Sequence, residues 1–481
     1  MKAIGRESET QFLQGLLESE KSEFLAVYRR WRVGKTFLVD SIFFSMYTFR
    51  HSAASNDSKN SASKMMEIQL AAFQDSLRLY GDDGQGDIEN WIQAFARLRS
   101  LIQKKNNSTG KIVIFLDELP WMDTPGSDFM TAFSLFWNNY CFPRGDILLI
   151  ACGSSMSYMS KKILLGQGSM FHRVSKELNL SPFTLKQTEE FLLHKGIHYS
   201  RYEIVCTYMI FGGIPYYLDY LMKGQTLAQN VDRLFFAQGA TLANEFTALM
   251  SQSFANSSSA EKIIVALNDK RKGLERAELC ETSNVKDGGD FSETLNALIA
   301  SGFVMRYVPF GMSQRHPHYK LFDPFCLFFL RFVKGNTSLD HFFFQQHIES
   351  PSLNAWRGLT YELVCMHHVN EIKAALGLTV IRTETSLLPL SDVNDGKKAQ
   401  IDLIINRADN VATICEVKFS GASFEVSKKY YEELIERSAL IATKLKKKQS
   451  MQHVLITTFG LKTNNYSSFF DASLCFDDLF R

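Results

Sequence analysis

The hydrophobic and polar positions of the first 180 residues follow a repeating order of short apolar runs and amphipathic stretches. Three runs consist almost entirely of apolar, often β-branched or aromatic residues: 24–28, 112–116 and 147–152. Runs of this length and composition are typical of strands buried on both faces of a parallel sheet. With helices between the strands, they predict a doubly wound α/β domain over residues 1–180, with its ligand at the carboxyl ends of the strands.

The helical stretches of this first domain are expected around 65–80 and 90–105, where apolar residues recur with helical spacing. Residues 51–64 lack such periodicity and indicate an exposed loop within the domain. Beyond the first domain the pattern turns helical over 181–255, which predicts a small helical lid. We found no internal repeat.

The remaining sequence predicts two further parts. Over 256–335, helices closed by Gly302 and followed by an apolar segment at 303–308 indicate a winged helix-turn-helix with a connector. Over 336–481 the pattern indicates a second, smaller α/β domain, with a helix around 356–369 and strands near 379–383, 401–405, 411–417 and 453–458. Two Phe-rich segments, 322–332 and 342–344, are expected to pack between domains.

Composition adds mainly exclusions. Apolar residues make up 45% of the 481 residues and charged residues 22%, so the chain has enough apolar surface to fold around sizeable cores. The 53 basic and 51 acidic side chains leave a net charge of +2, which neither favours nor forbids a nucleic-acid or membrane-surface partner. The eight cysteines contain no CxxC pair and indicate reduced core residues. The N-terminus is charged and no apolar stretch reaches the ~18 residues of a membrane span, so we expect a cytoplasmic protein with no membrane partner.

A candidate phosphate-binding loop follows the first predicted strand. Between Arg29 and Thr36 the sequence reads RRWRVGKT, so the second half of the pattern GxxxxGK[ST] is present and Arg29 replaces its first glycine. In such a loop, backbone amides surround the phosphates, Lys35 reaches the β and γ oxygens, and the hydroxyl of Thr36 binds Mg²⁺. If the first position needs positive φ, a residue with a Cβ costs roughly 1 kcal/mol there, which would weaken ATP binding without abolishing it.

An acidic pair at the end of the second buried strand strengthens this interpretation. Asp117 can hold the metal and its water shell, and Glu118 can polarise an attacking water. The alternative is a lysine at an ordinary helix start together with a solvated acidic turn.

Together these segments resemble the archaeal-type ATPases, a family of the AAA+/STAND-like P-loop group. The resemblance rests on the sequences IGRE at 4–7, VGKT at 33–36, LDE at 116–118 and GIP at 213–215. It implies that ATP and Mg²⁺ are the cofactors and that the nucleotide is contacted by Gly5, Arg6, Arg32, Val33, Gly34, Lys35, Thr36 and Pro215. It also implies that Ser154 is a sensor and that Arg173 is the basic residue after the sensor strand.

The chain departs from that family at Arg29, where the usual loop begins Tyr-Gly, and at 167–168, where the usual segment runs Gly-Arg. Hydrolysis is therefore less secure than the fold. Ser154 has a second interpretation as a helix cap or turn hydroxyl, and 213–215 has one as a plain turn between helices.

A second constellation lies near the C-terminus. Asp402 falls in one predicted strand, and Glu416 and Lys418 fall in the next, where alternate side chains point the same way. A hairpin could bring the three together, and two carboxylates with a lysine can hold Mg²⁺ and activate water for phosphodiester cleavage. The alternative is a solvated or ion-paired group of strand-end charges.

This constellation resembles the core of the PD-(D/E)xK nucleases, and the C-terminal half resembles the DUF234 domain that accompanies archaeal-type ATPases. The resemblance implies that Glu362, on the preceding helix, is an additional acid, that Asp402 and Glu416 bind the metal, and that Lys418 is an electrophile or water orienter. Ile401 stands where the nuclease pattern has proline.

Basic residues suggest DNA as a partner. Residues 270–272 with Arg276 in the winged helix, and Lys444 with 446–448 in the last domain, could contact phosphates or could be solvated helix faces. The leading hypothesis is an ATPase whose nucleotide state controls a DNA-binding or Mg²⁺-dependent DNA-cleaving domain. The rival is a slow or inactive nucleotide-dependent switch whose nuclease-like domain only binds, and a third possibility is a protein that binds no nucleotide. The sequence leaves open whether the chain forms a homo-oligomer.

Overall fold

The computed structural model of the chain describes its residues except 1, 56–60, 106–109, 165–169, 171, 255, 269, 271, 337–339 and 395–396, and it describes the backbone but not the side chains of 389–394 and 397–399. The chain divides into two compact units, Met1–Ser181 and Pro182–Arg481. The division falls one residue beyond the predicted end of the first domain. The predicted lid, winged helix and C-terminal domain all lie in the second unit.

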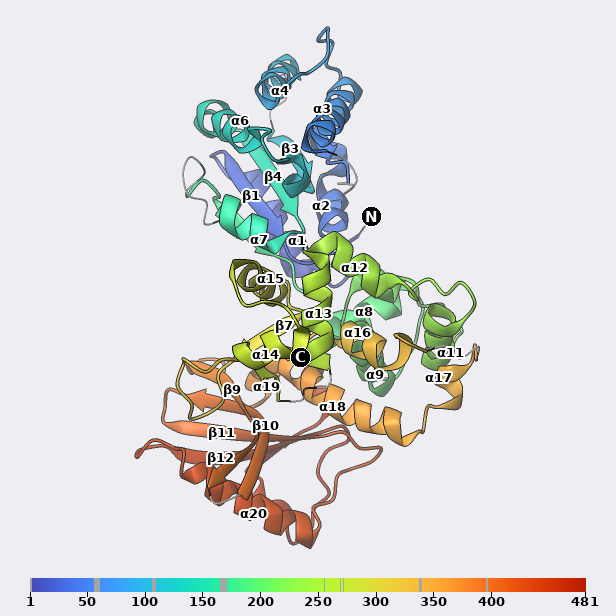
Figure 1. Cartoon of the computed structure of the whole chain (residues 1–481), viewed down its shortest axis with the longest axis vertical. Coiled ribbons are helices and arrows are strands. Elements are labelled where there is room, and N and C mark those ends of the chain that lie inside the picture. Colours follow the sequence, from blue (N-terminus) through green and yellow to red (C-terminus); the bar gives the residue numbers. More distant parts are fainter. Residues whose placement is uncertain are drawn as a thin grey trace. The chain divides into compact units, whose positions relative to one another are not determined.

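The first unit is built on a parallel sheet of five strands in the order β2-β3-β4-β1-β5. The strands are β1 (Glu23–Tyr28), β2 (Tyr47–Ser52), β3 (Ile112–Asp117), β4 (Ile147–Gly153) and β5 (Lys176–Asn179). Every residue of β1, β3 and β4 is buried, as their apolar runs predict, because helices cover both faces of the sheet (Figure 1). The helices are α1 (Glu7–Gly15), α2 (Lys35–Phe43), α3 (Ala62–Leu79), α4 (Trp91–Lys105), α5 (Leu119–Met122), α6 (Phe129–Phe136) and α7 (Met156–Tyr158).

The two edge strands of this sheet were not predicted. In β2, only Phe49 and His51 are buried, and in β5 the residues are exposed or half-buried. An edge strand gains most of its order from main-chain hydrogen bonds to its neighbour, so its sequence need not be apolar. Part of the predicted loop 51–64 therefore belongs to β2 and α3.

The second unit begins with helices: α8 (Leu185–His194), α9 (Arg201–Phe211), α10 (Pro215–Asp219), α11 (Leu227–Val231) and α12 (Glu245–Ser253). Three of them start at a capping box, in which a Thr or Ser hydroxyl and a Gln or Glu side chain three residues later satisfy each other's backbone N–H. These local signals define the helix starts that the apolar pattern leaves vague.

Three helices and a small antiparallel sheet, in the order β6-β8-β7, follow. The elements are α13 (Ser257–Asn268), β6 (Leu274–Glu275), α14 (Arg276–Ser283), α15 (Gly289–Ala300), β7 (Val304–Tyr307) and β8 (His318–Leu321). The loop between β7 and β8 inserts Phe310 into a core formed with residues of the C-terminal sheet, and the N–H of Phe310 donates to the carbonyl of Leu387 at 2.9 Å.

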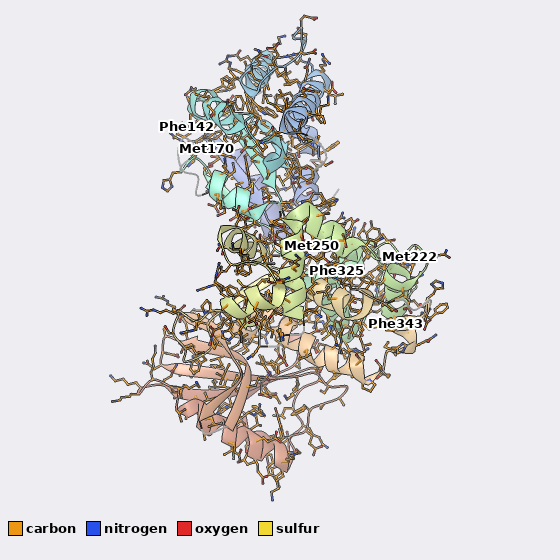
Figure 2. All side chains as sticks on the ribbon, viewed as in Figure 1. Phe142, Met170, Met222, Met250, Phe325 and Phe343 are labelled. Atoms are coloured by element: carbon orange, nitrogen blue, oxygen red, sulfur yellow. The ribbon has the colours of Figure 1, made fainter. Side chains whose placement is uncertain are left out.

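The Phe-rich segments join the helical part of the second unit to its C-terminal part, as predicted. They form α16 (Pro324–Phe328), the π-helical Phe329–Val333 and α17 (Phe343–Gln346). Phe325, labelled in Figure 2, stacks on Tyr217 with ring centroids 4.5 Å apart, while Phe328 meets Trp356 edge-on at 5.5 Å.

The C-terminal part contains a mixed five-stranded sheet in the order β13-β12-β11-β10-β9. Its elements are α18 (Pro351–His367), α19 (Val369–Ala375), β9 (Thr383–Asn394), β10 (Lys397–Arg407), β11 (Val411–Lys418), α20 (Lys428–Ala442), β12 (Ser450–Thr457) and β13 (Ala472–Leu474). Strands β9, β10 and β11 are antiparallel, whereas β12 and β13 run parallel to β11. Figure 1 shows α20 packed along this sheet.

The prediction of a strand at 379–383 is wrong in position, because β9 begins only at Thr383 and runs to Asn394. The apolar residues before Thr383 form a turn, and Val380 is 92% exposed. All eight cysteines are free, as expected. Among the described residues, no helix is both long and apolar enough to cross a bilayer.

Candidate functional site

The loop between β1 and α2 contains three residues with positive φ. Gly34 lies in the left-handed region with φ of 86°, and Lys35 is the first residue of α2. Arg29, which replaces the first glycine of the motif, has φ of 154°, and Arg32 has φ of 75°. Position 29 therefore has a positive φ, the condition under which a residue with a Cβ is expected to cost roughly 1 kcal/mol.

Lys35 is buried and all three of its ammonium protons have acceptors. Its Nζ donates to the carbonyl oxygens of Arg29 at 3.0 Å and Arg30 at 3.1 Å, and to Oγ of Ser154 at 3.0 Å. All three acceptors are uncharged. The lysine is therefore positioned inside the loop by bonds weaker than those it makes to an anionic oxygen.

The carboxylates at the end of β3 complete the cluster. Thr36 donates from Oγ1 to Oδ2 of Asp117 at 2.9 Å, and Ser154 donates from its hydroxyl to Oε1 of Glu118 at 2.7 Å. Glu118 adopts the left-handed conformation with φ of 50°, and its N–H donates to Oδ1 of Asp117 at 3.0 Å. The structure thus brings together five predicted residues, namely Lys35, Thr36, Asp117, Glu118 and Ser154.

The arrangement bears on one alternative role of Ser154, that of a helix cap. The hydroxyl of Ser154 does not cap a helix, since Ser155 is the N-cap residue of α7. Instead it links Lys35 to Glu118. Burial raises the pKa of the Glu118 carboxyl, while the nearby Lys35 opposes that rise.

The adjoining oxygens of Thr36 and Asp117 fit Mg²⁺. A hydroxyl and a carboxylate 2.9 Å apart are the hard oxygen ligands that this ion takes in nucleotide sites, with water and phosphate oxygens completing its shell. Lys35, the residue before Thr36 in α2, is the cation that could hold the phosphates.

Sequence reasoning missed an aromatic contact at this loop. Trp31 packs against Trp121 of α5 with ring centroids 5.7 Å apart, and the guanidinium of Arg32 lies 5.8 Å from the centre of the Trp31 ring. The sequence feature that could have indicated this contact is the pair of tryptophans, Trp31 in the loop and Trp121 shortly after the carboxylates that end β3. The contact ties the loop to the segment that carries Glu118.

Gly5 and Arg6 precede α1 in the same unit. Gly5 has φ of 67°, and the buried Arg6 guanidinium donates to Glu9 at 3.0 Å and to the carbonyl of Ser181 at 2.7 Å. These bonds connect the start of the chain to the end of the first unit. The contact of both residues with a nucleotide base stays a prediction.

The segment 213–215 lies in the second unit, between α9 and α10. Gly213 has φ of 65°, and a Cβ there would stand 2.3 Å from the carbonyl oxygen of Phe183, so only glycine fits. Its carbonyl accepts from the N–H of Phe183 at 2.8 Å, and Pro215 begins α10. The turn is tightly built for a local reason, and a role of Pro215 at the nucleotide stays a prediction.

The structure does not bring Arg173 to the phosphate loop. Its guanidinium lies 5.8 Å from the ring of Phe142, and its N–H donates to the carbonyl of Met170. Ser175, two residues later, donates its N–H to Phe24 near the start of β1. Arg173 therefore lies at the amino ends of the strands, opposite the edge that carries Lys35. The departure predicted at 167–168 lies outside the described residues.

A second cluster forms at the ends of β10 and β11. As predicted, Glu416 and Lys418 share one face of β11, and Nζ of Lys418 lies 2.7 Å from Oε1 of Glu416. Asp402 joins them through Oδ2, which accepts the N–H of Val417 at 3.0 Å. The hairpin pairing that brings the strands together sets Leu403 opposite Cys415.

Helix α20 adds two residues that the sequence reading missed. Tyr430 donates its hydroxyl to Oε1 of Glu416 at 2.5 Å, and Arg437 donates to both oxygens of Glu416 at 3.3 and 3.2 Å. Their separation, 437 minus 430 or seven residues, is two helical turns and places them on one face. That spacing, on the helix following the EVK strand, was the available signal.

The two carboxyls of this cluster have opposite pKa shifts. Burial, and next the charge of Glu416, raise the pKa of Asp402 to about 6, against the opposing effect of Lys418. Burial also acts to raise the pKa of Glu416, but Lys418 and then Arg437 hold it below its ordinary value. The site therefore holds one firmly ionised carboxylate beside one that titrates near neutral pH.

Glu362 lies on α18, a helix that packs against β10 and β11. It lines a hollow of about 210 Å³ together with Lys270 and Lys320. Burial raises the pKa of the Cys365 thiol, and the charges of Cys415, Asp402 and Glu362 add to that rise.

Mg²⁺ at this second cluster would depend on few ligands. Within the ranges that the structure describes, no three His, Cys, Asp or Glu side chains are grouped to hold a metal. Asp402 and Glu416 are the two carboxylates available, a number that suffices for Mg²⁺ when water and phosphate oxygens fill its shell. The donor set fits the ion, although Glu416 already accepts from three side chains.

The two basic patches predicted to contact DNA differ in their surroundings. Arg276 is bound to Asp287, with Nη2 2.5 Å from Oδ1, and Arg271 lies outside the described residues. The basic turn 446–448 precedes β12, whose first residue pairs with Val411, so it lies at the amino ends of β11 and β12. The carboxylate cluster lies at their opposite ends, where Lys418 pairs with Thr457.

Comparison with known proteins adds the following. Residues 4–221 match the family model described as an ATPase domain predominantly from Archaea. An uncharacterized protein of Methanocaldococcus jannaschii is 24% identical over 451 residues, covering 91% of this chain and 92% of that protein. Among solved structures, a Walker-type ATPase of Pyrococcus abyssi is 13% identical, with a TM-score of 0.47 over 68% of this chain and 96% of that one. The Orc1 protein of Aeropyrum pernix, solved in complex with DNA, is 13% identical, with a TM-score of 0.34 over 66% of this chain and 90% of that one.

The matched segment contains the phosphate loop, both β3 carboxylates and Ser154, which are the residues that the structure gathers at the carboxyl ends of the strands. Over residues 4–221 the chain is therefore similar to the ATPase domain found predominantly in Archaea.

Proposed function

We propose that this protein binds and hydrolyses ATP with Mg²⁺ at the loop 29–36, and that the nucleotide state controls a C-terminal domain that binds and cleaves DNA. The observation that carries the first half is the unbroken chain of hydrogen bonds from Lys35 through Ser154 to Glu118. It joins the phosphate-binding cation to the carboxylate that orients water.

The roles follow from these contacts. The amides of 32–34 and the ammonium of Lys35 hold the phosphates, and Thr36 with Asp117 holds Mg²⁺, which neutralises charge on the phosphate oxygens when bound. Anionic oxygens are stronger acceptors than the carbonyls and hydroxyl that Lys35 now contacts, so ATP draws Lys35 away from Ser154. Ser154 then keeps its bond to Glu118 and reports the γ-phosphate to the residue that orients the attacking water.

The remaining predicted nucleotide contacts, Gly5, Arg6 and Pro215, are carried by the family resemblance. Arg173 lies at the opposite edge of the sheet from Lys35. A role for Arg173 in hydrolysis then requires a second copy of the chain, which makes a homo-oligomer part of the proposal. We place the protein in the cytoplasm.

For the second unit we propose a winged helix at 257–321 and a restriction-endonuclease-like domain after it, corresponding to the DUF234 resemblance. The support is the order helix α18, antiparallel strands β9 to β11, helix α20 and parallel strand β12 around Asp402, Glu416 and Lys418. Asp402 and Glu416 would hold Mg²⁺, which would supply positive charge to activate a water and to polarise the phosphate. Lys418 orients that water. As the water oxygen bonds to phosphorus, the P–O bond to the leaving strand end breaks, the water gives a proton to solvent and the leaving oxygen takes one from solvent.

One observation favours a second candidate function, in which this domain only binds. Both oxygens of Glu416 already accept hydrogen bonds, from Lys418, Tyr430 and Arg437. A metal must displace or share those donors. If they persist, the chain is a nucleotide-dependent switch that holds DNA without cutting it.

The first experiment is calorimetric titration of Mg-ATP into the wild-type chain and into Lys35→Ala. We expect binding in the wild type and affinity lower by about 100-fold or more in the variant, equivalent to ~2.7 kcal/mol. Lys111→Ala is the matched control, because Lys111 lies at the amino end of β3 and contacts the carbonyls of Lys21 and Gly145. Equal affinity in wild type and Lys35→Ala would refute the nucleotide site.

The nuclease half is tested by incubating plasmid DNA with Mg²⁺ or Mn²⁺, with and without ATP. We expect nicking that is lost in Asp402→Asn and in Lys418→Ala. Nicking at the wild-type rate by Asp402→Asn would refute the site. DNA binding without nicking in the wild type would establish the switch.

A further inference from the structure

Two hollows in the second unit adjoin each other, since they have two lining residues in common. The first, of about 400 Å³, is lined in part by Arg331, Lys334, Phe343 and His347. The second, of about 210 Å³, is lined in part by Lys270, Lys320, Trp356 and Glu362. Arg331 and Ser352 line both, and they are joined by a hydrogen bond from Nη2 to Oγ at 3.5 Å. We call the joined hollows the α18 groove.

The charges that line the α18 groove are mostly positive. Lys270, Lys320, Arg331 and Lys334 contribute cations, whereas Glu362 is the acidic residue among the described lining residues. Lys334 is also ion-paired with Glu261 at 2.9 Å, but both side chains are more than a third exposed, so water screens this pair. The lining charges therefore attract an anion more than they repel it.

The backbone of α18 adds to this field. Ser350 is its N-cap, with a hydroxyl that accepts from the N–H of Leu353, and Ser350, Ser352 and Leu353 line the first hollow. The amino end of a 17-residue helix carries a partial positive charge. The amino end of α18 therefore adds to the positive potential that the lysines and the arginine create in the groove.

Aromatic rings alternate with these charges. Phe332, Phe343 and Phe344 line the first hollow, and Trp356 lines the second. Phe343, labelled in Figure 2, is half-buried and stacks on the ring of His347 with centroids 4.5 Å apart. Cations interleaved with aromatic rings in a concave surface suit the phosphates and bases of a single strand.

The groove leads toward the carboxylate cluster. Glu362 lines its second hollow and belongs to α18, the helix that packs against β10 and β11. A strand in the second hollow therefore lies against the helix that contacts the two strands of the carboxylate cluster.

The surfaces that usually read a duplex are poorly suited to it here. Helix α15, the third helix of its group, exposes Asp290 and Glu293 and follows the Arg276–Asp287 pair. The loop between β7 and β8 is held against the C-terminal sheet through Phe310. Like charge and a docked loop both oppose contact with duplex phosphates.

We infer that the α18 groove binds a single strand of nucleic acid. The inference rests on the proposed function for the identity of the polyanion as a nucleic acid, but it concerns binding and not cleavage. A strand bound here has its phosphates on Lys270, Arg331 and Lys320 and a base against Phe343.

The test is fluorescence anisotropy with a labelled oligothymidylate, in EDTA and without ATP, so that neither cleavage nor nucleotide binding is needed. Lys270→Glu with Arg331→Glu should weaken binding by at least about tenfold and lower the slope of log Kd against log salt. Lys446→Glu with Lys448→Glu changes the net charge equally at the other edge of the sheet and should weaken it less than about twofold.

Several outcomes discriminate. A wild-type chain that does not bind the oligonucleotide, or a larger loss in the Lys446/Lys448 variant, overturns the groove. Tighter binding of the matching duplex than of the single strand, or equal binding of thymidine monophosphate and the oligonucleotide, also overturns it. Asp402→Asn should bind as the wild type does, so failed cleavage with intact groove binding would refute the nuclease and leave this inference standing. Phe343→Leu, which keeps every charge, should weaken binding by about fivefold through lost stacking.

Discussion

The two units each hold a lysine near two carboxyl groups, and they hold it in different ways. In the first unit Lys35 donates only to uncharged oxygens and reaches Glu118 through the Ser154 hydroxyl. In the second unit Lys418 lies 2.7 Å from the Glu416 carboxylate, which Arg437 also contacts. A lysine on neutral acceptors can be drawn away by an arriving phosphate, whereas a lysine in a buried ion pair is held in place.

The difference teaches how each site can respond to a ligand. Binding at the phosphate loop exchanges weak internal bonds for stronger ones, so it can drive a rearrangement at Glu118. Binding at the second cluster must compete with an existing network around Glu416. We therefore expect the first unit to switch and the second to act as a preformed site, and the following variants test that contrast.

The largest expected effect is on stability in the second unit. Glu416→Gln removes the carboxylate charge that pairs with both Lys418 and Arg437. The two partly buried cations then lack an anionic partner at this position. Breaking such a network should lower the free energy of unfolding by about 3 kcal/mol. Urea unfolding measures it, and Glu425→Gln, which breaks the exposed pair with Lys462, is the control that should leave the midpoint unchanged. Equal midpoints for both variants would contradict a held Lys418.

The next effect is a pH dependence of stability. His368 is fully buried, its Nδ1 donates to the carbonyl of Val364 at 2.8 Å, and its Nε2 accepts the N–H of Leu185 at 2.9 Å. If Nε2 were protonated, its N–H and the N–H of Leu185 would be two donors facing each other. Burial lowers the pKa of His368 from 6.5 to about 3; the hydrogen bond to Val364 opposes this shift, and the nearby charge of His367 adds to it. As pH falls, the unfolded chain binds this proton before the folded chain does. The contribution of neutral His368 to the free energy of unfolding is therefore complete above pH ~6.5 and is lost progressively toward pH ~3, with about 2 kcal/mol lost at pH ~5.

Denaturant unfolding of wild type and His368→Gln between neutral and mildly acidic pH measures this effect. The variant should show the shallower loss, whatever its stability at neutral pH. His51 in the first unit, whose pKa burial and Arg50 lower to about 4, should contribute with the same sign. Parallel pH curves for wild type and His368→Gln would count against the neutral tautomer.

A smaller effect should separate sensing from binding in the first unit. Ser154→Ala removes the bridge between Lys35 and Glu118, so we expect kcat for ATP hydrolysis to fall about tenfold while the affinity for Mg-ATP changes less than about threefold. Ser155→Ala is the control, because that hydroxyl lies near Ser157 and outside the cluster. A fall in affinity with unchanged kcat would assign Ser154 to binding alone.

The smallest effect is at Arg29. Arg29→Gly relieves the unfavourable φ of 154° and should tighten Mg-ATP binding by about fivefold, equivalent to ~1 kcal/mol. Arg29→Ala removes the guanidinium but keeps a Cβ, so it should show no such gain. If alanine improves binding as much as glycine does, the guanidinium and not the backbone limits the loop.

Much of the first unit was predictable because its inner strands and its loop are both local signals. The runs at 112–116 and 147–152 are buried on both faces, and the GKT sequence opens α2. The edge strands β2 and β5 were missed, because pairing with one neighbour leaves little trace in their composition. In the second unit β9 was misplaced, since the apolar residues before Thr383 belong to a turn.

The chemistry of the second cluster was less accessible from the sequence. Spacing alone put Glu416 and Lys418 on one face of a strand, and it suggested that Asp402 lies nearby. It did not reveal that Tyr430 and Arg437 occupy Glu416, or that Arg276 is neutralised by Asp287. These contacts join different segments of the chain, and no periodic pattern in the sequence indicates which segments meet.

By itself, the sequence determined the alternation of buried strands and helices, the phosphate loop with arginine in place of its first glycine, and the order of the two carboxylate constellations, because each depends on residues close together in the chain. Only the tertiary structure decided that Ser154 links Lys35 to Glu118, that Arg173 lies at the far edge of the sheet and that Lys270, Arg331 and the start of α18 line one groove. The physical reason is that hydrogen bonds and fields act over a few ångströms of space, so they depend on which distant segments folding brings into contact.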